Sequence, residues 1–421
     1  MKTFLKIIGT LVLLIVIAGV SLYALDFYNV YHFQVGDFKI SDINKLWNKS
    51  DSMKKLEIGV SGADQGQNGQ SQSQAQTNLV ASPLNGQLIS QERAQMPVVA
   101  VMIENSPPAR QQSGLDKADV VYETLAEGGI TRFMALFQNE DVLVVGPVRS
   151  ARSYFVEIVR EYNAWYAHVG GSADGIKLIA KYGLHDLDQF FVDKPYWRDS
   201  NRVKTRGFEH GMYVSILALR DYVKGQAELG SFESWGFKDD APVSNLLQSS
   251  TQTSTQAAAP AKAVANSAQT ISVNFSFPSF LAQWKYDSVK NVYNRSNGGV
   301  AHVDAQSGQQ LFAKNIIVQY VKMTPILNNQ KGDDSALKLD LIGSGDGVLF
   351  LDGQMIPITW KKAKSGDHTQ FYYADGAGAG SASANASGVN AGAGSSSGQK
   401  IQLNRGVTWV ELAEKGKVSY K

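Results

Sequence analysis

The most informative stretch of this chain is Gly146-Pro147-Val148-Arg149-Ser150-Ala151-Arg152. An apolar run at residues 142–145 precedes it, and an amphipathic run at residues 154–164 follows it. This pattern predicts a buried strand, a tight turn at Gly146 and then a helix, with Ser150 as the N-cap. A strand that leads into a helix is typical of α/β proteins.

Arg149 and Arg152 are three residues apart, so a helix that begins at Ser150 would place both on one face of its first turn. The helix dipole already makes this end positive, and an uncompensated cation there costs about 0.3–1 kcal/mol. A negatively charged group should therefore lie against the turn. It is either a bound anion, such as a phosphate, a carboxylate or a uronic acid, or a carboxylate of the protein. The candidate protein partners are Glu104, Glu123 and Glu127.

Strand and helix patterns alternate over residues 82–247. Short apolar runs predict strands, and longer amphipathic runs predict helices. We expect strands at residues 98–103, 120–125, 130–137, 142–145 and 165–169, and helices at residues 154–164, 174–182 and 212–224. The alternation predicts an α/β domain with a mixed or mainly parallel sheet.

A second turn, Gly170-Gly171-Ser172, follows the predicted strand at residues 165–169. In open α/β sheets, ligands bind beyond the carboxyl ends of the strands, near helix N-termini. If the strands before the two turns are neighbours, backbone N–H groups and two guanidinium groups converge on one crevice. The predicted ligand-binding residues there are Gly146, Arg149, Ser150, Arg152, Gly170, Gly171 and Ser172, with Arg132 as a further choice.

Acidic and amide side chains near strand ends are further candidates. Glu104 and Asn105 directly follow the first predicted strand, where site residues are common, although an ordinary proline-rich loop is the alternative. Asp119, Glu123 and Glu127 are spaced by four, and two nearby carboxylates can perform acid–base chemistry on glycosides. We take Glu104 and Glu123 as candidate catalytic residues and Asn105 as a candidate ligand-binding residue. A structural role is the alternative for each.

His168 and His210 lie near carboxylates in the sequence, so either could act as a general base. We take His168 as a candidate catalytic residue and His210 as a candidate ligand-binding residue, with a structural role as the alternative. No metal-binding spacing, nucleotide-binding loop or serine nucleophile motif is present, so we predict no metal and no cofactor. The chain has no cysteine, a net charge of +2 and no basic stripe, and we expect no nucleic-acid partner.

The N-terminal residues predict the cellular location. Residues 7–25 are uncharged and long enough to cross a bilayer as a helix. Lys2 and Lys6 precede this run and Asp26 follows it, so we expect a cytoplasmic N-terminus and exported globular domains. A cleaved signal peptide, with a weak site at Gly19-Val20-Ser21, is the alternative. The predicted partner of residues 7–25 is therefore the lipid bilayer of the cell membrane, crossed once.

Composition divides the rest of the chain. Residues 26–81 are predicted to be a juxtamembrane stalk and a Gln/Ser/Gly-rich linker, and residues 248–269 a second low-complexity linker. Residues 270–421 predict a mainly antiparallel β domain, with a flexible insertion at residues 376–398. Asp352-Gly353 predicts a hairpin, residues 343–347 a loop, and residues 407–412 the final strand.

The chain resembles the YerB-like lipoprotein family. The resemblance is carried by residues 97–105, 109–123, 127–133, 146–152 and 209–213, and by residues 315–319, 343–347, 359–362 and 403–409. It implies two consecutive domains of unknown function and an outward-facing, membrane-tethered placement, but no established activity. This chain departs from the family because it has no cysteine for lipid attachment and carries a predicted membrane helix instead.

These observations predict a membrane-anchored, extracytoplasmic protein that binds an anionic envelope ligand, a glycan or a phosphate-bearing molecule. Arg149 and Arg152 would hold the anion. One alternative is an envelope glycan hydrolase or phospho-glycosyl transferase that uses the candidate acid–base residues beside the same arginines. Another is a scaffold in a membrane protein complex, in which both arginines are buried and paired within the protein and an apolar patch is exposed elsewhere.

Overall fold

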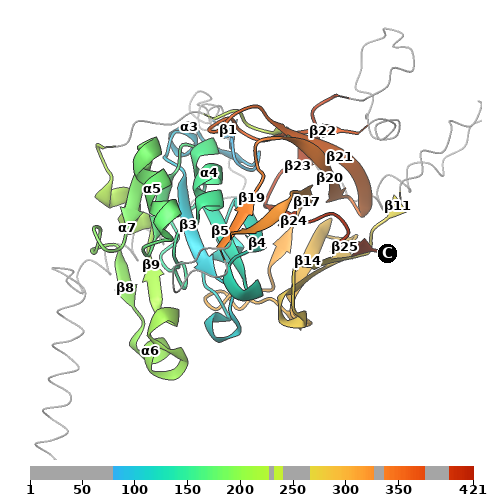
Figure 1. Cartoon of the computed structure of the whole chain (residues 1–421). Helices are drawn as coiled ribbons and strands as arrows, with labels where there is room; N and C mark the ends of the chain where they lie inside the picture. Colours follow the sequence, from blue (N-terminus) through green and yellow to red (C-terminus); the bar gives the residue numbers. More distant parts are fainter. Residues whose placement is uncertain (1–78, 227–231, 240–265, 327–335, 375–397) are drawn as a thin grey trace, which may run out of the picture. The chain divides into compact units, whose positions relative to one another are not determined.

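The computed structural model describes residues 79–226, 232–239, 266–326, 336–374 and 398–421 (Figure 1). Residues 74–421 form one compact unit. The predicted membrane span, almost all of the predicted stalk, most of the second linker and residues 376–397 of the predicted insertion lie outside the described residues. Within the described ranges, no helix is long and apolar enough to cross a membrane.

A mixed sheet of eleven strands forms the centre of this unit. Its order is β11 (Asn266–Ser267), β21 (Gln354–Lys362), β20 (Gly343–Leu351), β17 (Asn315–Tyr320), β24 (Thr408–Ala413), β4 (Val120–Leu125), β5 (Thr131–Phe137), β3 (Val99–Glu104), β6 (Trp165–His168) and β7 (His185–Asp188), with β22 (Gln370–Tyr373) paired to β21. The strands β3, β6 and β7 are parallel, whereas β4 and β5 are antiparallel neighbours.

Strands from both sides of the predicted linker at residues 248–269 share this sheet. The parallel pair β24–β4 joins them, with Thr408 opposite Val120 and Glu411 opposite Glu123. A second parallel pair joins β10 (Gly236–Lys238) to β23 (Gln402–Asn404). The division into two domains at this linker stays a prediction, because the sheet itself is continuous across it.

The middle strands of the central sheet, such as β3, β5 and β24, are buried on both faces, which explains their continuous apolar runs. In β3, Val99, Val101 and Ile103 belong to one hydrophobic core, whereas Ala100 and Met102 belong to the other. This alternation follows from the two-residue period of a strand. Among the described residues, all buried members of both cores lie within residues 84–413, inside the compact unit of residues 74–421, and we therefore expect this unit to fold on its own.

Helices α4 (Ser153–Glu161) and α5 (Ala173–Tyr182) cover one face of the sheet and supply residues such as Phe155 and Ile179 to its core. The other face is covered by α7 (Ile216–Tyr222), by the ribbon of β8 (Tyr196–Arg198) and β9 (Met212–Val214), and by a second sheet. That antiparallel sheet contains β15 (Val300–Ala301), β14 (Val292–Asn297), β13 (Leu281–Asp287), β12 (Thr270–Asn274) and β25 (Val418–Tyr420), with β16 (Phe312–Ala313) paired to β14.

The remaining elements are short and lie outside the two main sheets. They are β1 (Leu79–Ala81), β2 (Leu88–Ser90), α3 (Gln91–Ala94), α6 (Ser200–Arg206), β18 (Met323–Ile326) and β19 (Ala336–Leu339). The predicted fold class is confirmed for the described residues, with a mixed α/β N-terminal region and a mainly antiparallel β C-terminal region. The predicted hairpin at Asp352-Gly353 is also confirmed, since it joins β20 to β21.

Two predicted elements of the N-terminal region are wrong. Residues 142–145 do not form a strand, because only Val145 pairs, in an isolated bridge with Val214. The run is apolar because Val145 packs in the core with Ile216 and Leu219 of α7. The predicted helix at residues 212–224 begins as strand β9 and becomes helical only after Ser215, whose side chain caps α7.

Two predictions in the C-terminal region also need correction. Residues 343–347 form the first half of β20 and not a loop, because Gly345 lacks a side chain and lets the Trp360 ring approach within 2.7 Å of the position that a Cβ would take. The strand predicted at residues 407–412 exists as β24, but it is not the last one. Strand β25 follows it and pairs with β12.

Candidate functional site

The stretch at residues 146–152 is inserted between the ends of two parallel strands. Arg149 N donates to Met102 O of β3 at 2.9 Å, and Val169 N, just after β6, donates to Arg149 O at 3.1 Å. Ala151 N donates to Gly170 O at 2.9 Å. The two predicted turns therefore meet at the carboxyl edge of the sheet, but beside β3 and β6, because the strand predicted directly before Gly146 does not form.

Gly146 is required by its surroundings. Its φ is +151°, and a Cβ there would lie 2.8 Å from Met212 O of β9. A side chain would therefore clash with backbone that has no freedom to move, because Val148 N donates to that same oxygen at 2.7 Å. Gly146 acts in folding the turn, and its role in binding a ligand stays a prediction.

Helix α4 begins within one residue of the predicted run, but its predicted N-cap is wrong. Its N-cap is Arg152, with extended backbone and no side-chain capping bond, so Ser150 is not the cap. Arg149 and Arg152 therefore do not share a first helical turn. The reason is that residues 149–151 are held extended by backbone bonds to β3 and to Gly170. The backbone oxygen of Ser150 accepts a hydrogen bond from Arg132 Nη1 at 3.0 Å.

Arg149 pairs with a carboxylate of the protein. Its Nη2 lies 3.1 Å from Glu104 Oε1, and its Nη1 donates to Glu209 O at 3.3 Å. Glu104 is buried and has two more partners, because its Oε1 accepts from Ser106 Oγ at 2.6 Å and its Oε2 lies 2.8 Å from His210 Nδ1. The Arg149 side chain is 27% exposed, so it remains partly open to solvent.

Arg152 and Arg132 share a different carboxylate, Glu127. Arg132 Nη2 lies 3.0 Å from Glu127 Oε2, and Arg152 Nε forms an ion pair with Glu127 Oε1. Burial lowers the pKa of Arg132, and the neighbouring Tyr154 and Glu104 partly oppose this effect. Glu104 and Arg132 are register partners on β3 and β5, so the two ion-pair groups form one cluster of three guanidinium groups and two carboxylates.

The second turn is used by the protein itself. The Ser172 side chain accepts from Gly175 N at 3.2 Å and so caps α5, as its residue type predicts. Gly170, at φ +56°, donates its N–H to Asp188 Oδ1 at 2.9 Å. Gly171 pairs with Ala151 in an isolated bridge. Gly170, Gly171 and Ser172 hold this edge of the sheet in place, and their role in binding a ligand stays a prediction.

His168 is fully buried at the end of β6. Its Nδ1 lies 2.8 Å from Gly170 O, and its Nε2 lies 2.9 Å from Asp186 Oδ1. Its ring packs against that of Tyr166, with 4.7 Å between the centroids. Because both ring nitrogens face oxygen atoms of the protein, His168 is better suited to holding the turn than to accepting a proton from a substrate.

Glu123 and Asn105 lie deeper, between the two sheets. Glu123 accepts from Thr131 Oγ1 at 2.7 Å and forms a buried ion pair with Arg295. Asn105 donates to Thr131 Oγ1 at 2.7 Å, and its Oδ1 accepts from Asn297 Nδ2 at 2.7 Å. Neither side chain reaches solvent, so the structure separates these two candidates from the partly exposed side chain of Arg149.

Sequence reasoning missed Arg110, Arg295 and Asn297 as polar partners. Arg110 donates to Asn105 Oδ1 at 3.1 Å and to Ser279 O at 2.7 Å, which ties the loop after β3 to the second sheet. Burial lowers the pKa of Arg110 to about 10. No local signal marks the contacts of Arg110 with Ser279, of Arg295 with Glu123 and of Asn297 with Asn105, because these partners lie 169, 172 and 192 residues apart along the chain.

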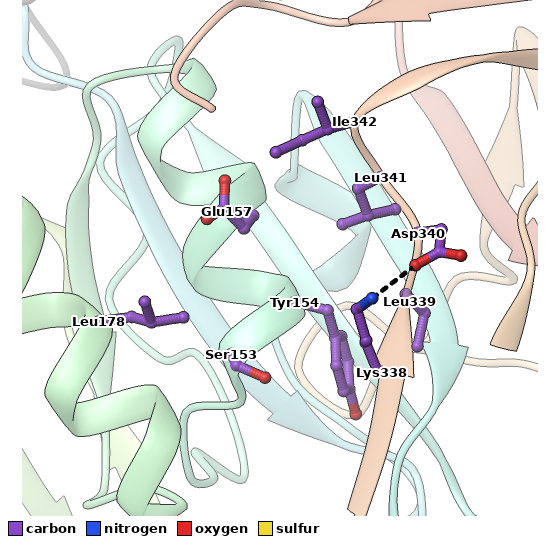
Figure 2. Close-up of a pocket in the computed structure, with 9 residues that line it drawn as sticks. All are labelled: Ser153, Tyr154, Glu157, Leu178, Lys338, Leu339, Asp340, Leu341 and Ile342. Carbon is purple, nitrogen blue, oxygen red and sulfur yellow. Dashed lines mark ion pairs between the residues drawn. The ribbon is translucent and has the colours of Figure 1, made fainter. Parts of the chain in front are cut away.

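A cavity of about 480 Å³ opens beside the start of α4 (Figure 2). Its lining residues are Ser153, Tyr154, Glu157, Leu178, Lys338, Leu339, Asp340, Leu341 and Ile342, and an ion pair of 3.2 Å joins Lys338 to Asp340. Burial raises the pKa of Tyr154 to about 12, and its hydroxyl donates to Leu125 O at 2.9 Å. The cavity contains none of the predicted site residues, although it begins directly after Arg152.

The predicted absence of a metal site was tested only where side chains are described. Among those residues, no group of three His, Cys, Asp or Glu side chains is arranged to hold a metal ion.

Comparisons with known proteins identify the family. Residues 84–229 match the N-terminal domain, and residues 271–382 the C-terminal domain, of the protein of unknown function DUF3048. The chain is 34% identical over 288 residues to "Putative lipoprotein YerB" of Bacillus subtilis (strain 168), covering 67% of this chain and 78% of that protein. The crystal structure of YerB protein from Bacillus subtilis has 25% identity and a TM-score of 0.62, and the match covers 81% of this chain and 99% of that one. The chain belongs to this DUF3048 family, as the resemblance implied.

Proposed function

We propose that this DUF3048 protein is a membrane-anchored, extracytoplasmic protein that binds an anionic envelope ligand through Arg149. The ligand would be a glycan acid or a phosphate-bearing molecule. The observation that carries the proposal is that the Arg149 side chain is partly exposed and shares its ion-pair partner Glu104 with His210. The anchoring rests on the predicted span at residues 7–25 and on the similarity to a protein named as a lipoprotein.

The composition of the cluster supports an anionic ligand. Arg132, Arg149 and Arg152 lie in one cluster with the carboxylates Glu104 and Glu127. Arg149 is the most exposed of the three arginine side chains, so it is the one that a ligand can reach. A planar guanidinium can bind two oxygens of a carboxylate or a phosphate at once, which favours these ligand classes.

An enzyme is the second candidate function. His210 Nδ1 contacts the buried Glu104 carboxylate at 2.8 Å, and such a contact orients an imidazole for acid–base chemistry. An envelope hydrolase or phospho-glycosyl transferase would then use Glu104 and His210 beside Arg149. A scaffold is supported by the pairing of Arg132 and Arg152 with Glu127, which needs no ligand.

A thermal-shift screen of residues 74–421 tests the binding proposal. The panel contains phosphate, pyrophosphate, uronic acids, muropeptides and teichoic-acid fragments. Binding stabilises the native state by about 2.7 kcal/mol at a hundred-fold excess over Kd, which is readily seen as a rise in Tm. We expect Arg149→Ala to abolish the rise. The matched control is Arg405→Ala, because Arg405 is also partly exposed and paired, here with Asp239.

The outcomes separate the candidate functions. An unchanged Tm with every ligand, or a shift that survives Arg149→Ala, rejects the proposal. Turnover of a muropeptide or a lipid-linked precursor that Glu104→Gln eliminates would favour the enzyme.

A further inference from the structure

Exposed aromatic side chains gather in residues 190–208. Phe190 is 70% exposed, Phe191 is 82% exposed and Phe208 is 62% exposed, and Trp197 is also exposed. Large apolar side chains on a protein surface, when they are contiguous, mark a surface that contacts something else. We call Phe190, Phe191, Trp197 and Phe208 the aromatic ridge.

A series of contacts connects the two ends of the aromatic ridge across the carboxyl edge of the sheet. The Phe190 ring lies 3.1 Å from the position that a Cβ would take at Gly170. The preceding residue, Val169, donates its N–H to Arg149 O, and the Arg149 side chain donates to Glu209 O, next to Phe208. Phe190 and Phe208 therefore lie on the same edge of the sheet, on either side of Arg149.

Cationic side chains border the aromatic ridge. They are Lys194, Arg198, Arg202, Lys204 and Arg206, and within the described ranges none of them forms an ion pair with a carboxylate. The guanidinium of Arg198 lies 3.6 Å from the centroid of the Phe208 ring, so cation and aromatic ring form one surface. The acidic residues of this segment are Asp193, Asp199 and Glu209, and Asp199 is already used as the N-cap of α6.

We propose that the aromatic ridge and its cations dock on the surface of a bilayer that contains anionic phospholipids. Exposed phenylalanine and tryptophan rings enter the boundary between headgroups and acyl chains, while lysine and arginine side chains pair with lipid phosphates. Charge complementarity therefore selects an anionic surface. The predicted span at residues 7–25 would hold the folded unit beside such a surface, so even weak contacts would be populated.

Vesicle co-sedimentation of residues 74–421 tests this docking without the predicted span. We expect the fragment to sediment with vesicles that contain phosphatidylglycerol, but not with phosphatidylcholine alone, and to be released by high salt. Phe190→Ser/Phe191→Ser should weaken this binding by about ten-fold or more, because two rings lose their burial in lipid. Lys204→Glu/Arg206→Glu should weaken it by about ten-fold, through lost attraction to the headgroups.

The control variant is Val289→Ser, at an apolar residue that is 83% exposed in the turn between β13 and β14. It should bind like the unmodified fragment. Absence of sedimentation with anionic vesicles, or equal binding by the double phenylalanine variant and the control, overturns the proposal. Phe190→Ser/Phe191→Ser keeps Arg149 and Glu104, so it should keep the Arg149-dependent rise in Tm with soluble ligands. Failure of the docking proposal is therefore distinguishable from failure of the soluble-anion site.

Discussion

Glu411 of β24 lies directly opposite Glu123 of β4, and both carboxyl side chains are fully buried. Arg295 of β14 forms an ion pair with Glu123, and its guanidinium lies 4.5 Å from the centroid of the Trp409 ring. Burial and, second, the nearby Glu123 raise the pKa of Glu411 well above its usual range. This environment favours the protonated, neutral form of Glu411 beside the ion pair of Glu123 and Arg295.

Glu411→Gln should change the free energy of unfolding by less than about 1 kcal/mol at pH 7, because an amide replaces a neutral carboxyl group of the same shape. Arg295→Met should cost about 3–5 kcal/mol, because Glu123 would be left as an unpaired buried charge. Urea unfolding of residues 74–421 measures both. Equal losses in the two variants would mean that Glu411 is ionised in the folded state.

The raised pKa of Glu411 also predicts how the free energy of unfolding depends on pH. A folded-state pKa above the unfolded value means that the native state binds more protons, so stability falls as pH rises above about 4.3. Glu411→Gln should remove this contribution, so the free energy of unfolding of the variant should fall less steeply as the pH rises above about 4.3. A curve that keeps the same slope in the variant would contradict the assignment.

The buried His368 predicts a pH dependence of the opposite sign, in which the free energy of unfolding decreases as the pH falls. Burial, followed by Lys362 and Lys400, lowers the pKa of His368 from 6.5 to about 3. The unfolded chain takes up the proton first, so the stability that the neutral ring provides is complete above pH 6.5 and is lost progressively toward pH 3. His368→Phe, which keeps a ring against Tyr162 and Trp235, should reduce the slope by up to about 1.4 kcal/mol per pH unit. Free energies of unfolding of the unmodified protein and of His368→Phe, measured between pH 7 and pH 3, test this prediction.

A buried ion pair attaches helix α4 to the C-terminal region. Lys362 Nζ of β21 lies 2.8 Å from Glu161 Oε1 of α4, and both side chains are buried. Lys362→Met should cost about 3–5 kcal/mol, whereas the further change Glu161→Gln should restore part of this loss. A double-mutant cycle in urea measures the coupling. Additive losses would show that the two groups do not interact.

Two serines near the arginine cluster should behave differently. Ser172→Ala should cost about 1 kcal/mol, because the side chain caps α5. Ser150→Ala should cost less than about 0.5 kcal/mol, because only the backbone oxygen of Ser150 is used, by Arg132. Thermal melts of the two variants make the comparison. A larger loss at Ser150 would contradict the observed start of α4.

Part of the candidate site could be predicted from the sequence. Apolar runs that end in polar residues placed Glu104 and His168 at strand ends, and the glycine-containing turns before Arg149 and after His168 do meet at one edge. The choice between a ligand and protein carboxylates stayed open, because pairing depends on strands whose order the sequence does not contain. In the structure, Arg149 pairs with Glu104 and Arg152 pairs with Glu127, and the Arg149 side chain stays partly exposed.

By itself, the sequence determined the local elements. Strands β3, β4, β5 and β6, helices α4 and α5 and the hairpin at Asp352-Gly353 follow from patterns that span a few residues, where period and turn residues are sufficient. Only the tertiary structure decided that β24 lies beside β4 and that Arg295 neutralises Glu123, 172 residues away. Such contacts depend on which buried faces pack together, and packing is a property of the whole fold and of no single segment.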